Sequence, residues 1–169
     1  MKKTFSLLIA ISILLSLSSC ASIASRFEKI PAPAVTYAEF PFEVVYEIDN
    51  EVVTVNDVFV CEFDGFAWNE NEGKHRQWRG YVKSTGKDHL VLLEEGSLTI
   101  ACKLGTAAYY MSDPSMDGAG EFTPYLYYTR TYASGGVSTS VAGLDKLLEQ
   151  YGISIISWKL SKPIENHFE

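Results

Sequence analysis

The sequence has few of the residues that usually mark a catalytic or metal centre. Among its 169 residues there are three histidines, His75, His89 and His167, and each is isolated in the sequence. A glycine-rich phosphate loop, a G-x-S-x-G elbow, an H-E-x-x-H pair and a C-x-x-C pair are all missing. The sequence therefore carries no local signature of an enzyme, although a catalytic site could assemble from residues that are distant in sequence.

Positive charge is also scarce. The chain has 14 Lys and Arg against 21 Asp and Glu, which gives a formal net charge of −7. This balance argues against nucleic acid as a partner and against docking of the folded domain on anionic lipids. The longest apolar run, Phe5–Leu17, is shorter than the roughly 20 residues that a permanent membrane span needs.

This short apolar run has the features of an export signal, because Lys2 and Lys3 precede it. The segment Leu17–Cys20 (L-S-S-C) resembles the lipobox of bacterial lipoproteins, in which an aliphatic residue and two small residues precede a cysteine. The resemblance implies that residues 1–19 are a signal peptide and that the Cys20 thiol, a good nucleophile for alkylation, carries the lipid. Removal of residues 1–19 takes away two lysines and no acid, so the net charge falls from −7 to −9.

The residues that follow the expected anchor are typical of a tether. Residues 20–35 are mostly small and contain two prolines without a hydrophobic period. Two or more acyl chains hold a protein stably on a bilayer. We therefore expect a lipid-anchored protein at the extracytoplasmic face of the cell membrane. In a host with two membranes the resemblance implies the outer membrane, because Ala21 is not Asp.

The remaining chain predicts one mainly β domain over residues 36–162, followed by a short tail over 163–169. Apolar and polar residues alternate with the period of half-buried strands. The expected strands are Phe40–Ile48, Val52–Phe63, Gln77–Ser84, His89–Leu93, Leu98–Leu104, the region around Ala107–Met111, Phe122–Tyr132 and Ile153–Leu160. Between the second and third of these we expect a polar loop over Asp64–Lys74.

Only the segment at about 140–151 has helical spacing, with Ser140 as the expected N-cap and Gly152 as the stop. Short strands at regular spacing, with one late helix, predict a single antiparallel β-sandwich or a barrel-like domain.

With Cys20 lipidated, two cysteines remain, Cys61 and Cys102. A pair of cysteines in an exported protein favours a disulfide, and in that case we expect the two to lie on adjacent strands. The alternative is that both are small buried apolar side chains within strands. The sequence leaves both alternatives open.

A loop near residue 117 has some features of a calcium site. Oxygen-bearing side chains occupy positions 1, 3, 5 and 9 of a calcium-loop template, and glycine occupies position 6. These side chains belong to Asp113, Ser115, Asp117 and Glu121. However, Pro124 stands where a bidentate Glu is expected, so a solvated turn is the favoured interpretation. No other cofactor is expected.

Aromatic residues form a second group of candidates. Exposed rings stack on sugar faces or anchor protein partners, whereas buried rings belong to the core. The candidates for a ligand-binding surface are Trp68, Trp78, Tyr125, Tyr127 and Tyr128. Because Tyr127 and Tyr128 must point to opposite faces of a strand, we expect some of this ring area to meet solvent.

Charge is segregated along the first half of the chain. Residues 30–73 contain ten acids and no Lys or Arg, whereas residues 74–87 contain five basic residues and no acid. Cross-strand pairing would place the basic segment beside one of the first two strands. We expect Arg79 or Lys83 to meet Glu43, Glu47 or Glu62. The alternative is an acidic patch for a cationic partner.

Four segments, Glu62–Phe66, Gly73–Arg76, Tyr151–Ile153 and Ile155–Trp158, give the domain a resemblance to uncharacterised small lipoproteins of Gram-positive bacteria. The resemblance implies no activity. The expected function is therefore a lipid-anchored binding or interaction module at the cell surface, with a protein or carbohydrate ligand. The alternatives are a small extracytoplasmic hydrolase acting on envelope or polysaccharide substrates, and an accessory subunit of an exported machine.

Overall fold

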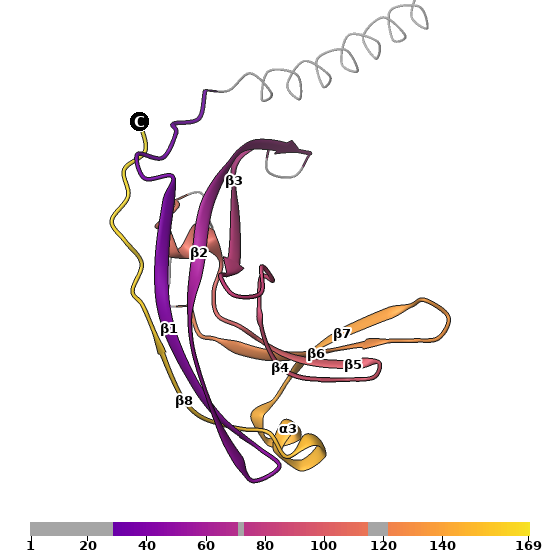
Figure 1. Ribbon diagram of the computed structural model, residues 1–169. Coiled ribbons are helices and arrows are strands. Elements are labelled where there is room, and N and C mark those ends of the chain that lie inside the picture. Colours follow the sequence, from indigo (N-terminus) through magenta and orange to yellow (C-terminus); the bar gives the residue numbers. More distant parts are fainter. Residues whose placement is uncertain (1–28, 71–72, 115–121) are drawn as a thin grey trace, which may run out of the picture.

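The chain folds into two four-stranded antiparallel sheets that share one core (Figure 1). The computed structural model describes residues 29–70, 73–114 and 122–169. Its elements are β1 (Tyr37–Ile48), β2 (Glu51–Asn69), β3 (Gly73–Val82), β4 (Leu90–Glu95), β5 (Leu98–Lys103), α2 (Ala107–Tyr110), β6 (Tyr125–Thr131), β7 (Val137–Ala142), α3 (Leu144–Tyr151) and β8 (Ser154–Leu160). The strand orders are β3-β2-β1-β8 and β4-β5-β6-β7. The expected mainly β fold is confirmed as a sandwich, and the sheets do not close into a barrel.

The long first hairpin follows directly from the sequence pattern. Alternate residues of β1, from Phe40 to Tyr46, are buried, as the period of two predicts. A two-residue turn at Asp49 and Asn50 joins β1 to β2, and both turn residues have positive φ, of 52° and 65°. Turns of this hand match the twist of the strands they connect.

The prediction of a polar loop over Asp64–Lys74 is wrong, because strands cover most of this range. β2 continues to Asn69 and β3 begins at Gly73, and the two strands pair from Phe66 opposite Arg76 to Asn69 opposite Gly73. The register shifts between Phe63 and Phe66, where Gly65 has a φ of 93°. Asp64 and Gly65 form this irregularity in β2, and the two strands pair again from Phe66 onward.

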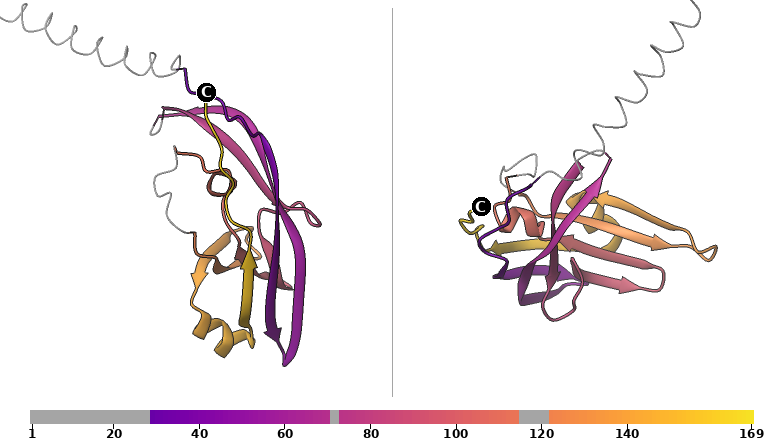
Figure 2. Two further views of the ribbon diagram at one scale, coloured as in Figure 1. Left: turned by 90° about the vertical axis from the view of Figure 1, so that its left-hand side faces the viewer. Right: turned by 90° about the horizontal axis from the view of Figure 1, so that it is seen from above.

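The second sheet packs across the first, and their strands cross at a steep angle (Figures 1 and 2). Phe40 and Phe59 of the first sheet share one core with Ile100 and Leu126 of the second. The β6–β7 hairpin projects well beyond the region where the two sheets face each other (Figure 1).

The prediction of a strand around Ala107–Met111 is wrong, because Ala107–Tyr110 form the short helix α2 and Met111 caps its end. The Thr106 side chain accepts a hydrogen bond from the Tyr109 N–H and so caps the helix. Tyr110 is buried against Phe40 and Phe59, with ring centroids 4.6 and 5.5 Å away. The capping hydroxyl and this aromatic packing override the strand propensity of the tyrosines.

The expected helix at 140–151 is confirmed only over Leu144–Tyr151. α3 is preceded by Gly143, and Gly152 ends it in the left-handed conformation, as expected. Ser140 and Val141 belong to β7 instead, where the residues alternate between intermediate and exposed positions. Pairing with β6 prevails over helical spacing there, and Ser140 is not the N-cap. No helix in the described part of the chain is long and apolar enough to cross a membrane.

The two ends of the described chain pair with each other. The N–H groups of Ala32 and Ala34 donate to the carbonyls of Glu169 and His167, at 2.8 and 2.7 Å. The Asn166 side chain bonds both backbone groups of Val35. The tail expected over 163–169 is therefore attached to the end of the expected tether.

Candidate functional site

The five candidate aromatics do not form one surface. Trp78 donates its Nε1–H to Asp113, at 2.7 Å, so its polar edge faces an internal partner. Trp68 is half-buried in β2. Tyr125 and Tyr127 lie on the outer face of β6 with ring centroids 6.4 Å apart, whereas Tyr128 lies on the opposite face.

Asp113, the first residue of the calcium candidate, belongs to a buried ion pair. Its carboxylate accepts from Arg76 Nε and Nη2 at 2.8 and 2.7 Å, and it is 3% exposed. Arg76 also donates to the Pro31 carbonyl and stacks over the Phe168 ring, 4.5 Å from its centroid. The Arg76–Asp113 pair thus joins β3 to Pro31 and Phe168. The other three candidate ligands, Ser115, Asp117 and Glu121, lie outside the described residues.

Cys61 and Cys102 are free, fully buried thiols. Cys61 lies on β2 and Cys102 on β5, which belong to different sheets, so the expectation of adjacent strands is wrong. Each cysteine occupies an inward position of its own sheet, where it fills the shared core. Burial raises the pKa of both thiols to about 12, so neither is a nucleophile at neutral pH.

The segregation of charge along the sequence correctly indicated that the basic segment lies beside one of the first two strands. β3 pairs with β2, and Arg79 lies opposite Glu62 in the register, as expected. The ion pair of Lys83 forms with an acid that the sequence argument did not propose. Lys83 Nζ lies 2.9 Å from Oε1 of Glu39, on β1. Glu62 accepts instead from the Tyr81 hydroxyl, at 2.8 Å.

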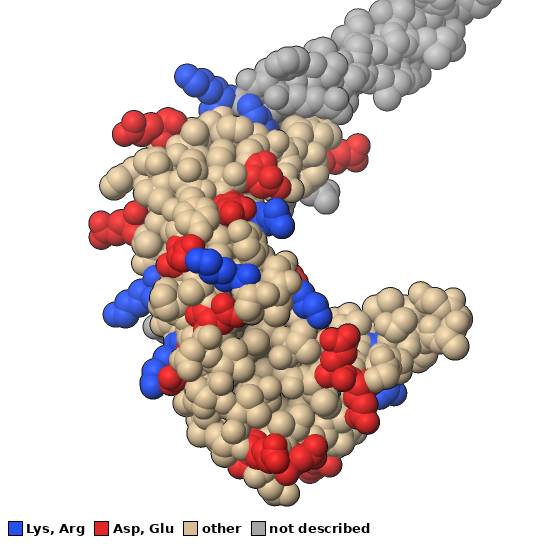
Figure 3. Space-filling model, in the orientation of Figure 1, with Lys and Arg blue, Asp and Glu red and all other residues tan. Residues whose placement is uncertain are grey.

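The acids of the first sheet are also reached from the other side. Lys159 Nζ, on β8, lies 2.6 Å from Glu43 Oε1. The sequence argument had expected Arg79 or Lys83 as a partner of Glu43. In the space-filling view, acidic and basic side chains are intermixed over the upper and middle parts of this face, and acidic side chains alone show at its lower end (Figure 3). This mixing favours cross-strand pairing over an uninterrupted acidic patch.

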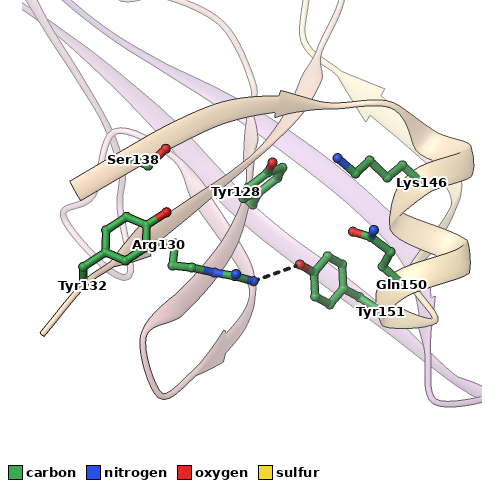
Figure 4. Close-up of a pocket in the computed structure, with 7 residues that line it drawn as sticks. All are labelled: Tyr128, Arg130, Tyr132, Ser138, Lys146, Gln150 and Tyr151. Carbon is green, nitrogen blue, oxygen red and sulfur yellow. Dashed lines mark hydrogen bonds between the residues drawn. The ribbon is translucent and has the colours of Figure 1, made fainter. Parts of the chain in front are cut away.

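A polar cleft lies between the β6–β7 hairpin and α3 (Figure 4). Its volume is about 480 Å³, and we call it the Arg130–Lys146 cleft. It is lined by Tyr128, Arg130, Tyr132, Ser138, Lys146, Gln150 and Tyr151. Strand alternation accounts for the hairpin side of the cleft, because Tyr128 and Arg130 are two residues apart and share the inner face of β6.

Packing of α3 completes the other wall of the cleft. Leu147 is 1% exposed and anchors the helix in the core. Lys146 and Gln150, one turn apart on the helix, extend toward the hairpin (Figure 4). Arg130 Nη2 lies 3.5 Å from the Tyr151 hydroxyl, and Lys146 Nζ lies 5.6 Å from the centroid of the Tyr128 ring.

The electrostatics of this cleft are unusual for an acidic chain. None of its lining residues is a carboxylate. Within the described ranges, neither Arg130 nor Lys146 has a carboxylate oxygen within 4 Å, unlike Arg76, Lys83 and Lys159. Two cations, three phenol hydroxyls, a serine hydroxyl and an amide therefore face one open space. This set can bind an anion and hydrogen-bond the hydroxyl groups around it.

Groups suited to acid–base catalysis do not converge on the cleft. His75 Nδ1 lies 3.2 Å from the Gly73 carbonyl, and His89 Nδ1 lies 2.7 Å from Asp88. Burial raises the pKa of Asp88, but hydrogen bonds from Lys103 and His89 lower it by more, so the pKa lies below its usual value. Across residues 29–70, 73–114 and 122–169, no group of three His, Cys, Asp or Glu side chains could hold a metal ion.

Sequence reasoning identified Tyr128 but missed the two cations that give the cleft its character. The two-residue spacing of Tyr128 and Arg130 within a strand was the available signal. Comparisons with protein-family models, with curated proteins and with solved structures find no match to this chain.

Proposed function

We propose that this protein is a lipid-anchored binding module at the extracytoplasmic face of the cell membrane. We propose further that the Arg130–Lys146 cleft takes an acidic, hydroxyl-rich ligand, such as a glycan segment that bears carboxylate groups. The observation that carries the proposal is the pair of cations that face an open cleft without a carboxylate partner among the described residues. In a chain of net charge −7, such cations are available to an anionic ligand.

The shape of the domain supports this assignment. The described chain begins at the end where Pro31 and Phe168 meet Arg76, whereas α3 lies at the opposite end (Figure 1). A lipid at Cys20 would therefore be attached at the end of the domain opposite the cleft. Tyrosine rings beside the cations would add stacking area for sugar rings.

A binding role is favoured over the alternative of a hydrolase. A two-carboxylate hydrolase needs one carboxyl group with a raised pKa in its cleft. Glu39 and Asp88 both have a pKa below the usual value, and no carboxylate lines this cleft within the described residues.

Calorimetric titration of the full-length chain in detergent tests the proposal. The probes are an oligomer of galacturonic acid and its methyl ester, which has the same sugar rings without the charge. We expect the acid to bind and the ester to bind at least about tenfold more weakly, since charge-assisted hydrogen bonds are lost. Equal affinities for the two probes would refute charge recognition.

The matched variants are Arg130→Gln and Arg79→Gln. Both remove one exposed arginine beside a tyrosine, but Arg79 lies on β3 and stacks over Tyr81, 5.1 Å from the ring centroid. We expect about a tenfold loss of affinity for Arg130→Gln and an unchanged affinity for Arg79→Gln. Similar losses in both variants would point to non-specific attraction.

The anchor is tested separately. We expect Cys20→Ser to abolish lipid labelling and to release the protein from the membrane fraction, because the serine hydroxyl does not replace the thiol in the alkylation. Retention of a labelled lipid in this variant would overturn the anchor, and it would leave the titration result unaffected.

A further inference from the structure

β7 is an edge strand with a sequence that reads the same in both directions. It is the last strand of the second sheet, and its residues 137–141 are Val-Ser-Thr-Ser-Val. A palindromic strand can pair with a copy of itself in antiparallel orientation so that every residue meets an identical one. The centre of such a pair would be Thr139.

The backbone of β7 has the correct phase for this pairing. The Tyr132 N–H donates to the Gly136 carbonyl, and the register continues along β6 and β7 without a shift. Hydrogen-bonded pairs alternate along an antiparallel ladder. The backbone groups of Val137, Thr139 and Val141 therefore point away from β6, and those of Ser138 and Ser140 point toward it.

β7 also differs from the other three edge strands in charge. β3 carries Lys74, Arg76 and Arg79, β4 ends in Glu94 and Glu95, and β8 carries Lys159. Charged residues on an edge discourage pairing with another chain. β7 has none, and Val137 and Val141 are 64% and 72% exposed. The hairpin that contains it projects from the molecule with little charge toward its tip (Figure 3).

We propose that two copies of this chain associate through β7, about a two-fold axis that passes between the two Thr139 residues. Val137 then lies opposite Val141 of the second copy, and Ser138 lies opposite Ser140. Each outward-pointing residue exchanges both backbone hydrogen bonds with its counterpart, and the exposed valines pack in cross-strand pairs. A second copy fits better than an unrelated peptide because the palindrome matches every side chain with its like.

The arrangement has a consequence for ligand binding. A two-fold axis perpendicular to a continuous sheet keeps the same faces of the two copies on one side. Ser138 lines the Arg130–Lys146 cleft, so the two clefts open on the same side of the joined sheet. A polymer with repeated acidic groups can then occupy both, which raises its apparent affinity without new contacts. This consequence rests on the proposed function, whereas the pairing itself does not.

The pairing is tested by sedimentation of the full-length chain in detergent, with no ligand present. We expect a dimer that dissociates on dilution. Thr139→Lys places like charges directly opposite each other and should weaken association by about tenfold or more. Ser134→Lys adds the same charge in the β6–β7 turn and should leave the dimer intact. A monomer at every concentration, or a dimer that Thr139→Lys leaves unchanged, overturns the proposal.

Cross-linking provides a second readout. The Cα atoms of a hydrogen-bonded antiparallel pair are close enough for a disulfide. We expect Thr139→Cys to form a covalent dimer under mild oxidation at least about tenfold faster than Ser134→Cys, since pairing holds the two thiols at a high effective concentration. Cys20 is replaced by serine in both variants, and Cys61 and Cys102 are buried, so no other thiol competes. Equal rates would overturn the pairing and would leave the cleft proposal unaffected.

Discussion

Arg76 and Arg130 show two opposite uses of the same side chain. Arg76 lies on β3 with a side chain that is 5% exposed, and it is fully engaged by Asp113, Pro31 and the ring of Phe168. Arg130 lies on β6 and is exposed, and its side chain has one long hydrogen bond among the described residues, to the Tyr151 hydroxyl. One guanidinium joins Pro31 and Phe168 to β3, and the other faces an open cleft.

The difference shows where each cation contributes free energy. A buried arginine needs its partner, because an uncompensated charge in the interior is costly. An exposed arginine contributes little to stability, and its donors remain available to a ligand. The Arg76 region is therefore expected to respond to mutation through folding, and the Arg130 region through binding.

The largest effect is expected from Asp113→Ala. It leaves the Arg76 guanidinium buried without its carboxylate, so we expect a loss of about 3–5 kcal/mol in the free energy of unfolding. Urea denaturation measures this loss. The double variant Arg76→Met with Asp113→Ala should be less destabilised than Asp113→Ala alone, because no charge remains buried. A single variant as stable as the parent would contradict the structural role of the pair.

Trp78→Phe sharpens the comparison within the same region. It keeps an aromatic ring against Phe63 but removes the Nε1–H that donates to Asp113, at 2.7 Å. We expect a loss of about 1.5–3 kcal/mol in urea denaturation, the range for hydrogen bonds to charged groups. The control is Trp158→Phe, since Trp158 also packs against the core and its indole has no hydrogen-bond partner in the described part of the chain. Equal losses would assign the effect to ring size alone.

Lys146→Met tests the Arg130–Lys146 cleft. We expect about a fivefold loss of affinity for the galacturonic acid oligomer at low salt, an unchanged free energy of unfolding, and a smaller difference as salt is raised. Lys159→Met removes another exposed lysine, one that pairs with Glu43 on the other sheet, and serves as the control. A loss that persists unchanged at high salt would argue against an electrostatic role.

The parts of the fold that could be predicted are those fixed by local patterns. The alternation in β1 and the turn at Asp49 and Asn50 specify the first hairpin without reference to the rest of the chain. The segregated charges also predicted that the basic segment lies beside one of the first two strands, and it pairs with the second. By contrast, the register shift near Gly65 and the cap by Thr106 depend on contacts that alternation does not encode.

The candidate site was harder to predict because it is assembled from elements distant in sequence. Tyr128 was a candidate from its ring, but Arg130 and Lys146 carry no motif. They meet because Leu147 anchors α3 in the core beneath the hairpin. The ion pair of Asp113 was missed for a related reason, since its partner Arg76 lies on a strand that the sequence argument began one residue later.

The smallest effect is expected at the exposed ion pair of Lys83 and Glu39. Hydrogen bonds from Lys83 and then Tyr37 hold the pKa of the Glu39 carboxyl below its usual value. A lowered folded-state pKa means that this stabilisation is present above the ordinary carboxyl pKa and is lost as pH falls through the lowered one. Both side chains are exposed, so we expect Lys83→Met to cost far less than Asp113→Ala and its effect to fade with salt.

The measurement compares urea denaturation of the parent, Lys83→Met and Lys162→Met at neutral pH and again below the lowered pKa of Glu39. Lys162 is exposed and has no carboxylate within 4 Å among the described residues, so its removal should have no pH-dependent effect. We expect the parent and Lys83→Met to differ slightly at neutral pH and to converge in acid, because the protonated Glu39 no longer attracts the lysine. A difference that grows in acid would have the wrong sign for this pair.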